Sequence, residues 1–208
     1  MLSCDYMYLS RSGVFARDEL PQGERDAAIR VIVAKCSKTQ ALFARVVPQK
    51  GVDPDGYVVS QLRDDIVWLG HSKIVLRSDN EPALLRVVEK TVAALRRSAG
   101  VESASSEGSI PYDPQTNGHA EGAVRLINGQ FRALLLRLER HISSQIPLDR
   151  PVLAWLAAHA AYVRTVRVVG SDGAIAQQRA RGNPNFPVLL AFGELCRYKT
   201  RSREGGIG

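Results

Sequence analysis

Three acidic residues lie where carboxylates could do chemistry. Asp5 interrupts an apolar run at the start of the chain, where a lone buried charge is costly unless something compensates it. Asp79 ends another apolar run just before a helix start, the position outside a strand's carboxyl end where α/β proteins bind ligands. Glu121 follows a segment with two prolines and an Asn-Gly step, which predicts a mobile loop. Three such carboxylates, if they met, would repel one another and would need divalent cations.

Each acid also has an ordinary structural explanation. Asp5 could be a partly exposed residue on an edge strand, since most lone acids are solvated. Asp79 and Glu121 could cap helices or favour the positive helix N-terminus, and these roles are compatible with catalysis.

The segments that would position these acids follow an α/β pattern. Apolar and β-branched runs predict strands over 2–9, 30–34, 41–47, 74–76 and 101–105. Helical spacing predicts helices over 53–70, 82–98, 118–141 and 151–169. This order predicts a mixed five-stranded sheet with helices on both faces.

Two further segments have no regular pattern. Residues 10–26 are charged and contain glycine and proline, which predicts a loop or insertion. Residues 170–208 are expected to form an irregular basic extension after a single domain that covers 1–169.

Two motifs resemble those of the integrases of retroviruses and long-terminal-repeat retrotransposons. Arg77-Ser78-Asp79-Asn80 is similar to the Ser-Asp-Asn that ends a strand in that family. Ile110-Pro-Tyr-Asp-Pro-Gln-Thr-Asn-Gly-His-Ala-Glu121 resembles the family's Pro-Tyr-x-Pro-Gln-x-x-Gly-x-x-Glu and is the more specific match. The resemblance extends from residue 1 to about 170.

The resemblance implies an RNase H-like fold and a DNA-joining enzyme. Asp5, Asp79 and Glu121 would be the catalytic residues and would hold Mg²⁺ or Mn²⁺, with two ions expected. Such a pair of ions supports in-line phosphoryl transfer, here 3′-end processing and strand transfer of retroelement DNA into target DNA.

Further residues are candidates for DNA contacts. Arg125, Asn128 and Arg132 follow Glu121 at helical spacing and share its face, and the alternative for Arg125 and Arg132 is a solvated helix face. In the family the positions four and seven after the glutamate touch DNA, and Asn128 departs from the usual lysine there. The resemblance also implies contacts to the DNA end from Tyr112, Gln115 and Asn117.

The charge is compatible with a polyanionic partner. The chain has a formal net charge of +7, and residues 122–208 carry 13 Lys and Arg against 5 Asp and Glu. The longest nearly uncharged stretch, 152–163, is far shorter than the roughly 20 residues of a membrane span. We expect an intracellular protein that is nuclear when it acts on DNA, with homodimers or higher oligomers as in the family.

The cysteines and tryptophans suggest no separate site. Three widely spaced cysteines fit neither a disulfide framework nor a zinc site, so Cys4, Cys36 and Cys196 are expected to be reduced packing residues. Trp68 and Trp155 are expected in the core or at an interface.

Some features depart from the family and leave other functions open. Glu81 replaces the usual glycine, 41 residues separate Asp79 from Glu121, and no His/Cys zinc domain precedes the core. The alternative to an enzyme is a catalytically inactive nucleic-acid-binding remnant, either a fragment of a polyprotein or a decaying copy. A nuclease or cut-and-paste transposase of the same fold is the third hypothesis.

Overall fold

The computed structural model describes residues 1–10, 13–16, 20–24, 28–108, 114–147, 150–182 and 190–197, with the side chains of 13, 14, 16 and 114–117 left aside. The strands are β1 (Leu2–Ser10), β2 (Gly13–Ala16), β3 (Ile29–Cys36), β4 (Leu42–Val47), β5 (Lys73–Ser78) and β6 (Ser103–Gly108). The helices are α1 (Tyr57–Trp68), α2 (Pro82–Leu95), α3 (Pro114–Ile142), α4 (Val152–Arg167), α5 (Ala176–Arg181) and a short 3-10 turn, Gln22–Glu24.

The sheet is mixed, as the order of segments predicts. Its strands lie in the order β4-β3-β1-β5-β6, and β2 pairs with β1 outside this path. The pairs β4-β3 and β3-β1 are antiparallel, whereas β1-β5 and β5-β6 are parallel. β1 is therefore the central strand, and Asp5 lies in its middle with a neighbouring strand on either side.

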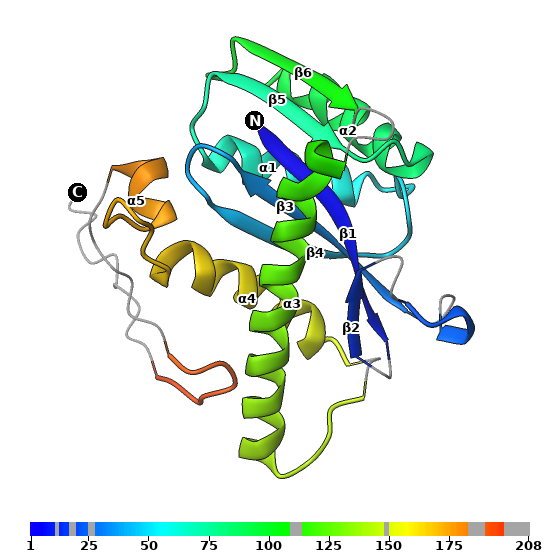
Figure 1. Ribbon diagram of the computed structural model, residues 1–208, viewed down its shortest axis with the longest axis vertical. Coiled ribbons are helices and arrows are strands. Elements are labelled where there is room, and N and C mark those ends of the chain that lie inside the picture. The colour runs from blue at the N-terminus through cyan, green and yellow to red at the C-terminus, as the bar shows by residue number, and fades with distance from the viewer. Residues whose placement is uncertain are drawn as a thin grey trace, which may run out of the picture.

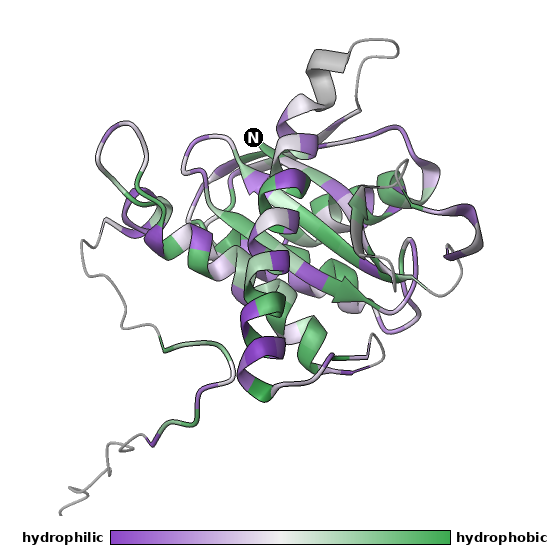
Figure 2. Ribbon diagram, turned by 60° about the horizontal axis from the view of Figure 1, so that its bottom comes forward, coloured by the Kyte–Doolittle hydropathy of each residue, from purple (hydrophilic) through white to green (hydrophobic). Residues whose placement is uncertain are grey.

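Two apolar cores cover the two faces of the sheet. Alternate residues of β1 serve different cores: Cys4 and Tyr6 pack with α1 and α2, and Met7 and Leu9 pack with α3 and α4. Figure 1 shows α3 crossing the sheet in front of β1, and Figure 2 shows the hydrophobic strands behind it. The predicted fold class, with helices on both faces, is confirmed.

The start of α1 shows how a polar residue sets a helix boundary. The sequence predicts a helix from Asp53, but α1 begins at Tyr57. The Asp53 carboxylate is only 4% exposed and accepts the backbone N–H groups of Tyr57 and Val58, at 2.7 and 2.9 Å. The residue therefore caps the helix from outside it, because the first N–H groups of a helix have no partner within the helix.

Three predictions about irregular segments need correction. The expected insertion 10–26 contains β2, which pairs with the end of β1, and the expected irregular tail contains α5. Both elements are short, so they give little periodic signal in the sequence. α3 begins at Pro114 and not at Gly118, so residues 114–117 belong to a helix and not to the predicted loop.

Other expectations are partly corrected. Trp155 is 72% exposed, so it is no core residue, and its role at an interface stays a prediction. Cys4 and Cys36 are buried as expected, whereas Cys196 is exposed. No helix in the described ranges is long and apolar enough to span a membrane.

The end of α4 covers the open edge of the sheet. The Thr165 hydroxyl is buried, accepts the Leu42 N–H at 2.9 Å and donates to the Leu42 carbonyl at 3.0 Å. An edge strand otherwise presents unpaired backbone groups. Thr165 thus fixes the C-terminal end of α4 against β4.

We expect Thr165→Val to lower the free energy of unfolding by roughly 2 kcal/mol, because valine has a similar shape but leaves two buried backbone groups of Leu42 unsatisfied. Urea denaturation of the two proteins measures this difference. Thr165→Ser keeps the hydroxyl and serves as the control. A valine variant as stable as the parent protein would show that this contact does not stabilise the edge.

Candidate active site

The register of β1 and β5 brings Asp5 and Asp79 together. Cys4 is the parallel partner of Ser78, and the next residues are Asp5 and Asp79. Asp79 therefore lies beside Asp5, just beyond the carboxyl end of β5. Neighbouring strands lie about 4.8 Å apart. Ile74 and Leu76 of β5 face the α1/α2 core, so Asp79, like Asp5, belongs to the face that α3 covers.

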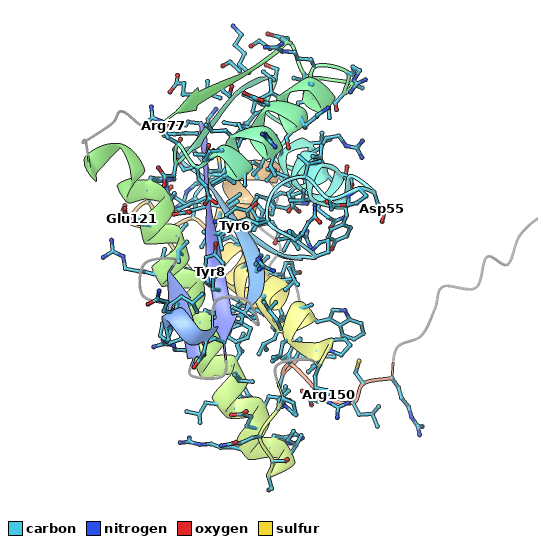
Figure 3. All side chains as sticks on the ribbon, turned by 90° about the vertical axis from the view of Figure 1, so that its right-hand side faces the viewer. Tyr6, Tyr8, Asp55, Arg77, Glu121 and Arg150 are labelled. Carbon is cyan, nitrogen blue, oxygen red and sulfur yellow. The ribbon has the colours of Figure 1, made fainter. Side chains whose placement is uncertain are left out.

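Glu121 lies on the helix that crosses this face. Ala120 and Ala123 beside it are buried, and Ala123 packs in the α3/α4 core, whereas Glu121 is exposed on the flank of α3. Figure 3 shows Glu121 on α3 beside the middle of β1, at the level of Tyr6. The acids of two strands and one helix therefore share one side of the sheet.

The electrostatics of Asp5 agree with this arrangement. Burial raises the pKa of Asp5, and the negative charges of Asp79, Glu81 and Glu121 raise it further, to about 6. The hydrogen bond from the Tyr6 N–H acts in the opposite direction but does not offset the burial. Asp5 is thus a half-buried carboxylate that is subject to the negative charges of three other acids, and a nearby cation would stabilise its charged form.

The donor set fits a hard divalent cation. Asp5 and Asp79 each turn Oδ1 to the next backbone N–H, of Tyr6 and Asn80, at 2.7 Å in both cases. The second oxygen of each carboxylate is not used in these bonds, and carboxylate oxygens are the ligands Mg²⁺ prefers. Among the described residues, however, no group of three or more acids, histidines or cysteines lies close enough to hold one ion. The two aspartates are positioned by the strands, and Glu121 would have to move its side chain inward.

Lys50 balances the charge of Glu81, a further acid close to Asp79. Glu81 precedes α2, is nearly buried and forms an ion pair with Lys50. The Lys50 ammonium lies 5.8 Å from the centroid of the Tyr6 ring, and the Tyr6 hydroxyl accepts the Gly51 N–H at 3.1 Å. No sequence signal connects Lys50 to Glu81, because the two are paired only through the packing of the loop after β4 against α2.

The candidate DNA contacts are only partly described. Arg125 and Arg132 are exposed on α3, and Asn128 is half-buried between them along the same helix. Gln115 and Asn117 lie in the first turns of α3, but their side chains are outside the described part, and Tyr112 is outside it altogether. The polar stripe that follows Glu121 is therefore present on one continuous helix.

A cavity lies elsewhere on the molecule. It has a volume of about 590 Å³ between β4, α1 and α4, and Phe43, Trp68, Trp155 and Tyr162 are among its lining residues. β4 lies two strands away from β1, so this cavity is separate from the carboxylates.

Comparisons with known proteins connect the fold to one group of structures. No family model and no curated protein matches the sequence. The catalytic core domain of BIV integrase matches with a TM-score of 0.53 and 16% identity over 86% of this chain and 91% of that one. The HTLV-2 integrase catalytic core domain in complex with magnesium, in a dimeric form, matches with a TM-score of 0.50 and 15% identity over 88% and 94%.

A third match comes from a larger assembly. A chain of the simian T-cell lymphotropic virus intasome in complex with the PP2A regulatory subunit B56 gamma has a TM-score of 0.56 and 16% identity. The match covers 95% of this chain but only 59% of that one. These likenesses show that the chain has the fold of a retroviral integrase catalytic core, which confirms the fold expected from the two motifs.

Proposed function

We propose that the chain is an integrase-type polynucleotidyl transferase that inserts retroelement DNA into target DNA. The observation that carries the proposal is the parallel register of β1 and β5, which ends at Cys4 and Ser78 and so brings Asp5 beside Asp79 on the face covered by the helix that carries Glu121. The likeness of the fold to integrase cores supports it.

In this proposal the three acids bind two Mg²⁺ ions, and Mn²⁺ is an alternative. Held by Asp5, Asp79 and Glu121, such ions would supply the activation of the attacking hydroxyl and the stabilisation of the leaving oxygen of a phosphodiester, in 3′-end processing and in strand transfer. Asp5 is positioned by β1, and Asp79 is positioned by the end of β5, which it directly follows. Glu121 completes the site from α3, and Arg125 and Arg132 on the same helix bind backbone phosphates of DNA.

The proposal also includes where and in what form the protein acts. DNA insertion takes place on chromosomal DNA, so we propose a nuclear site of action. We further propose a homodimer or a higher oligomer, and the exposure of Trp155 on α4 is compatible with a covered face.

A specific observation favours a second candidate, an inactive nucleic-acid-binding remnant. No three acids in the part that the structure describes lie close enough to share an ion, and Glu81 stands where the family has glycine. A remnant would keep the polar stripe of Arg125, Asn128 and Arg132 on α3 and would bind DNA without cutting it.

A strand-transfer assay on a short labelled duplex with recessed 3′ ends separates these functions. With Mg²⁺ or Mn²⁺ we expect labelled products longer than the substrate strand, and none after chelation of the metal. Shorter products alone would indicate a nuclease or a cut-and-paste transposase. Salt-sensitive binding without any metal-dependent product would indicate the remnant. The absence of DNA binding at low salt would contradict both the integrase and the remnant.

A further inference from the structure

A row of hydrogen-bond donors lies one pleat away from the two aspartates. The β1 registers place Ser3 opposite Lys35 of β3 on one side and opposite Arg77 of β5 on the other. Ser3 alternates with Leu2 and Cys4, which face the α1/α2 core, so the three side chains belong to the face covered by α3. Ser3 lies two positions before Asp5 in β1, a distance of about 7 Å.

Two helices add a donor each to this row. α3, which carries His119, packs against β1 and β3, and α4, which carries Arg164, packs against β4, the neighbour of β3. Lys35, the N-terminal ammonium of Met1 and Arg77 lie near enough to His119, and Arg164 near enough to Lys35, for their positive charges to act there. Thr165 holds this end of α4 to Leu42, and Leu42 is the partner of Lys35 in the β3-β4 register. We call Ser3, Lys35, Arg77, His119 and Arg164 the donor cluster.

The donor cluster has buried polar atoms without partners. Ser3 is only 2% exposed, and its hydroxyl makes no hydrogen bond within the described part of the chain. The same holds for both ring nitrogens of His119 and for Nε of Arg77 and of Arg164. A buried polar group without a partner costs free energy, so an acceptor bound at this place would stabilise the donor cluster.

The charges of the donor cluster are also poorly balanced. Arg77 forms an ion pair at 2.8 Å with Glu107, which lies in the edge strand β6. Within the described ranges no carboxylate pairs with Lys35 or Arg164, and burial together with the charge of Arg164 lowers the pKa of Lys35. Half-buried cations of like charge repel one another, so an anion placed among them would be stabilised.

We propose that the donor cluster binds a phosphate group. Ammonium, guanidinium, imidazole N–H and hydroxyl groups can all donate hydrogen bonds, and a phosphate offers several charged acceptor oxygens to meet them. The donor cluster lies about one pleat from the aspartates, a place that fits the phosphate next to the reacting phosphate of a nucleic-acid strand. This assignment of the source depends on the proposed function. Inorganic phosphate or a free nucleotide offers the same chemistry.

The test follows binding by NMR on the full chain in a buffer without divalent metal. Inorganic phosphate is titrated while the His119 ring and the backbone amides of Ser3 and Lys35 are observed. We expect saturable shifts at these positions, and Lys35→Gln and Arg164→Gln should each weaken binding by about tenfold, the effect of one charged hydrogen bond. Lys90→Gln removes an exposed charge from α2, on the other face, and should leave the affinity unchanged.

A second titration separates the two sources of phosphate. If a short DNA duplex displaces inorganic phosphate from these positions, the occupant is a nucleic-acid phosphate; if both bind together, the occupant is a free phosphate or nucleotide. Unchanged spectra with both probes would overturn the proposal, as would an equal loss of affinity in Lys90→Gln and Lys35→Gln. Arg164→Lys replaces the glutamine variant should that variant fail to fold, and should bind phosphate more weakly than the parent.

This test is independent of catalysis. Because no divalent metal is present, phosphate binding can be measured in a protein that joins no DNA. Conversely, metal-dependent DNA joining by a chain whose donor cluster binds no phosphate would leave the proposed function standing and remove only this site.

Discussion

Asp79→Asn is expected to lower metal-dependent strand transfer by at least about a thousandfold, because metal-ion stabilisation of the transition state amounts to several kcal/mol. Asp79 directly follows β5, and the register of β1 and β5 brings it beside Asp5, so the variant removes one of the two carboxylates that the strands position. The rate of product formation at saturating Mg²⁺ measures the loss.

The same variant should still bind DNA. Asparagine removes a negative charge beside the place where a phosphate would lie, so the affinity for DNA at low salt should be equal or higher. Asp55→Asn is the matched control, since Asp55 is exposed before α1 and Figure 3 shows it far from Glu121. Full strand transfer by Asp79→Asn would exclude Asp79 as a metal ligand, and loss of DNA binding would indicate a misfolded protein.

The central part of the site can be predicted from the sequence because its signals are local. The apolar residues around Asp5 and before Asp79 predict two strands, and the proline at position 82 predicts the helix that follows β5. Asp79 directly follows β5, the position where α/β proteins bind ligands, whereas Asp5 lies in the middle of β1. The local pattern therefore predicts the two strands and their acids, and the parallel register of β1 and β5 places the acids side by side.

The donor cluster could not be predicted in the same way. Ser3, Lys35 and Arg77 are brought into one row by strand register, and register depends on pairings between distant segments that no local pattern records. Arg164 joins them only because Thr165 attaches α4 to the edge strand. The same reason explains why the Lys50-Glu81 pair is invisible in the sequence.

Asp5 gives the chain a stability that depends on pH. Its pKa is about 6 in the folded protein against 3.8 for an ordinary aspartate, so the folded state holds the proton more tightly than the unfolded state. Stability from this residue is therefore fully present below about pH 4 and is lost as the pH rises through 6, by up to about 3 kcal/mol. The sign is opposite to that of a salt-bridged aspartate.

We therefore expect Asp5→Asn to stabilise the chain at pH 7.5 by up to about 3 kcal/mol and to have little effect at pH 4, because asparagine has no charge to lose. Urea denaturation in chelator across this range measures the difference, with Asp55→Asn as an exposed control that should change stability by less than about 0.5 kcal/mol.

Mg²⁺ should stabilise the parent at pH 7.5 more than at pH 4, since only the charged carboxylates bind it. Equal stability of Asp5→Asn and the parent at pH 7.5 would show that the charge of Asp5 does not destabilise the folded protein in the absence of metal. A gain in the variant together with no response of the parent to Mg²⁺ would instead favour the inactive remnant, in which the acids still repel one another but no longer bind the ion that an enzyme requires.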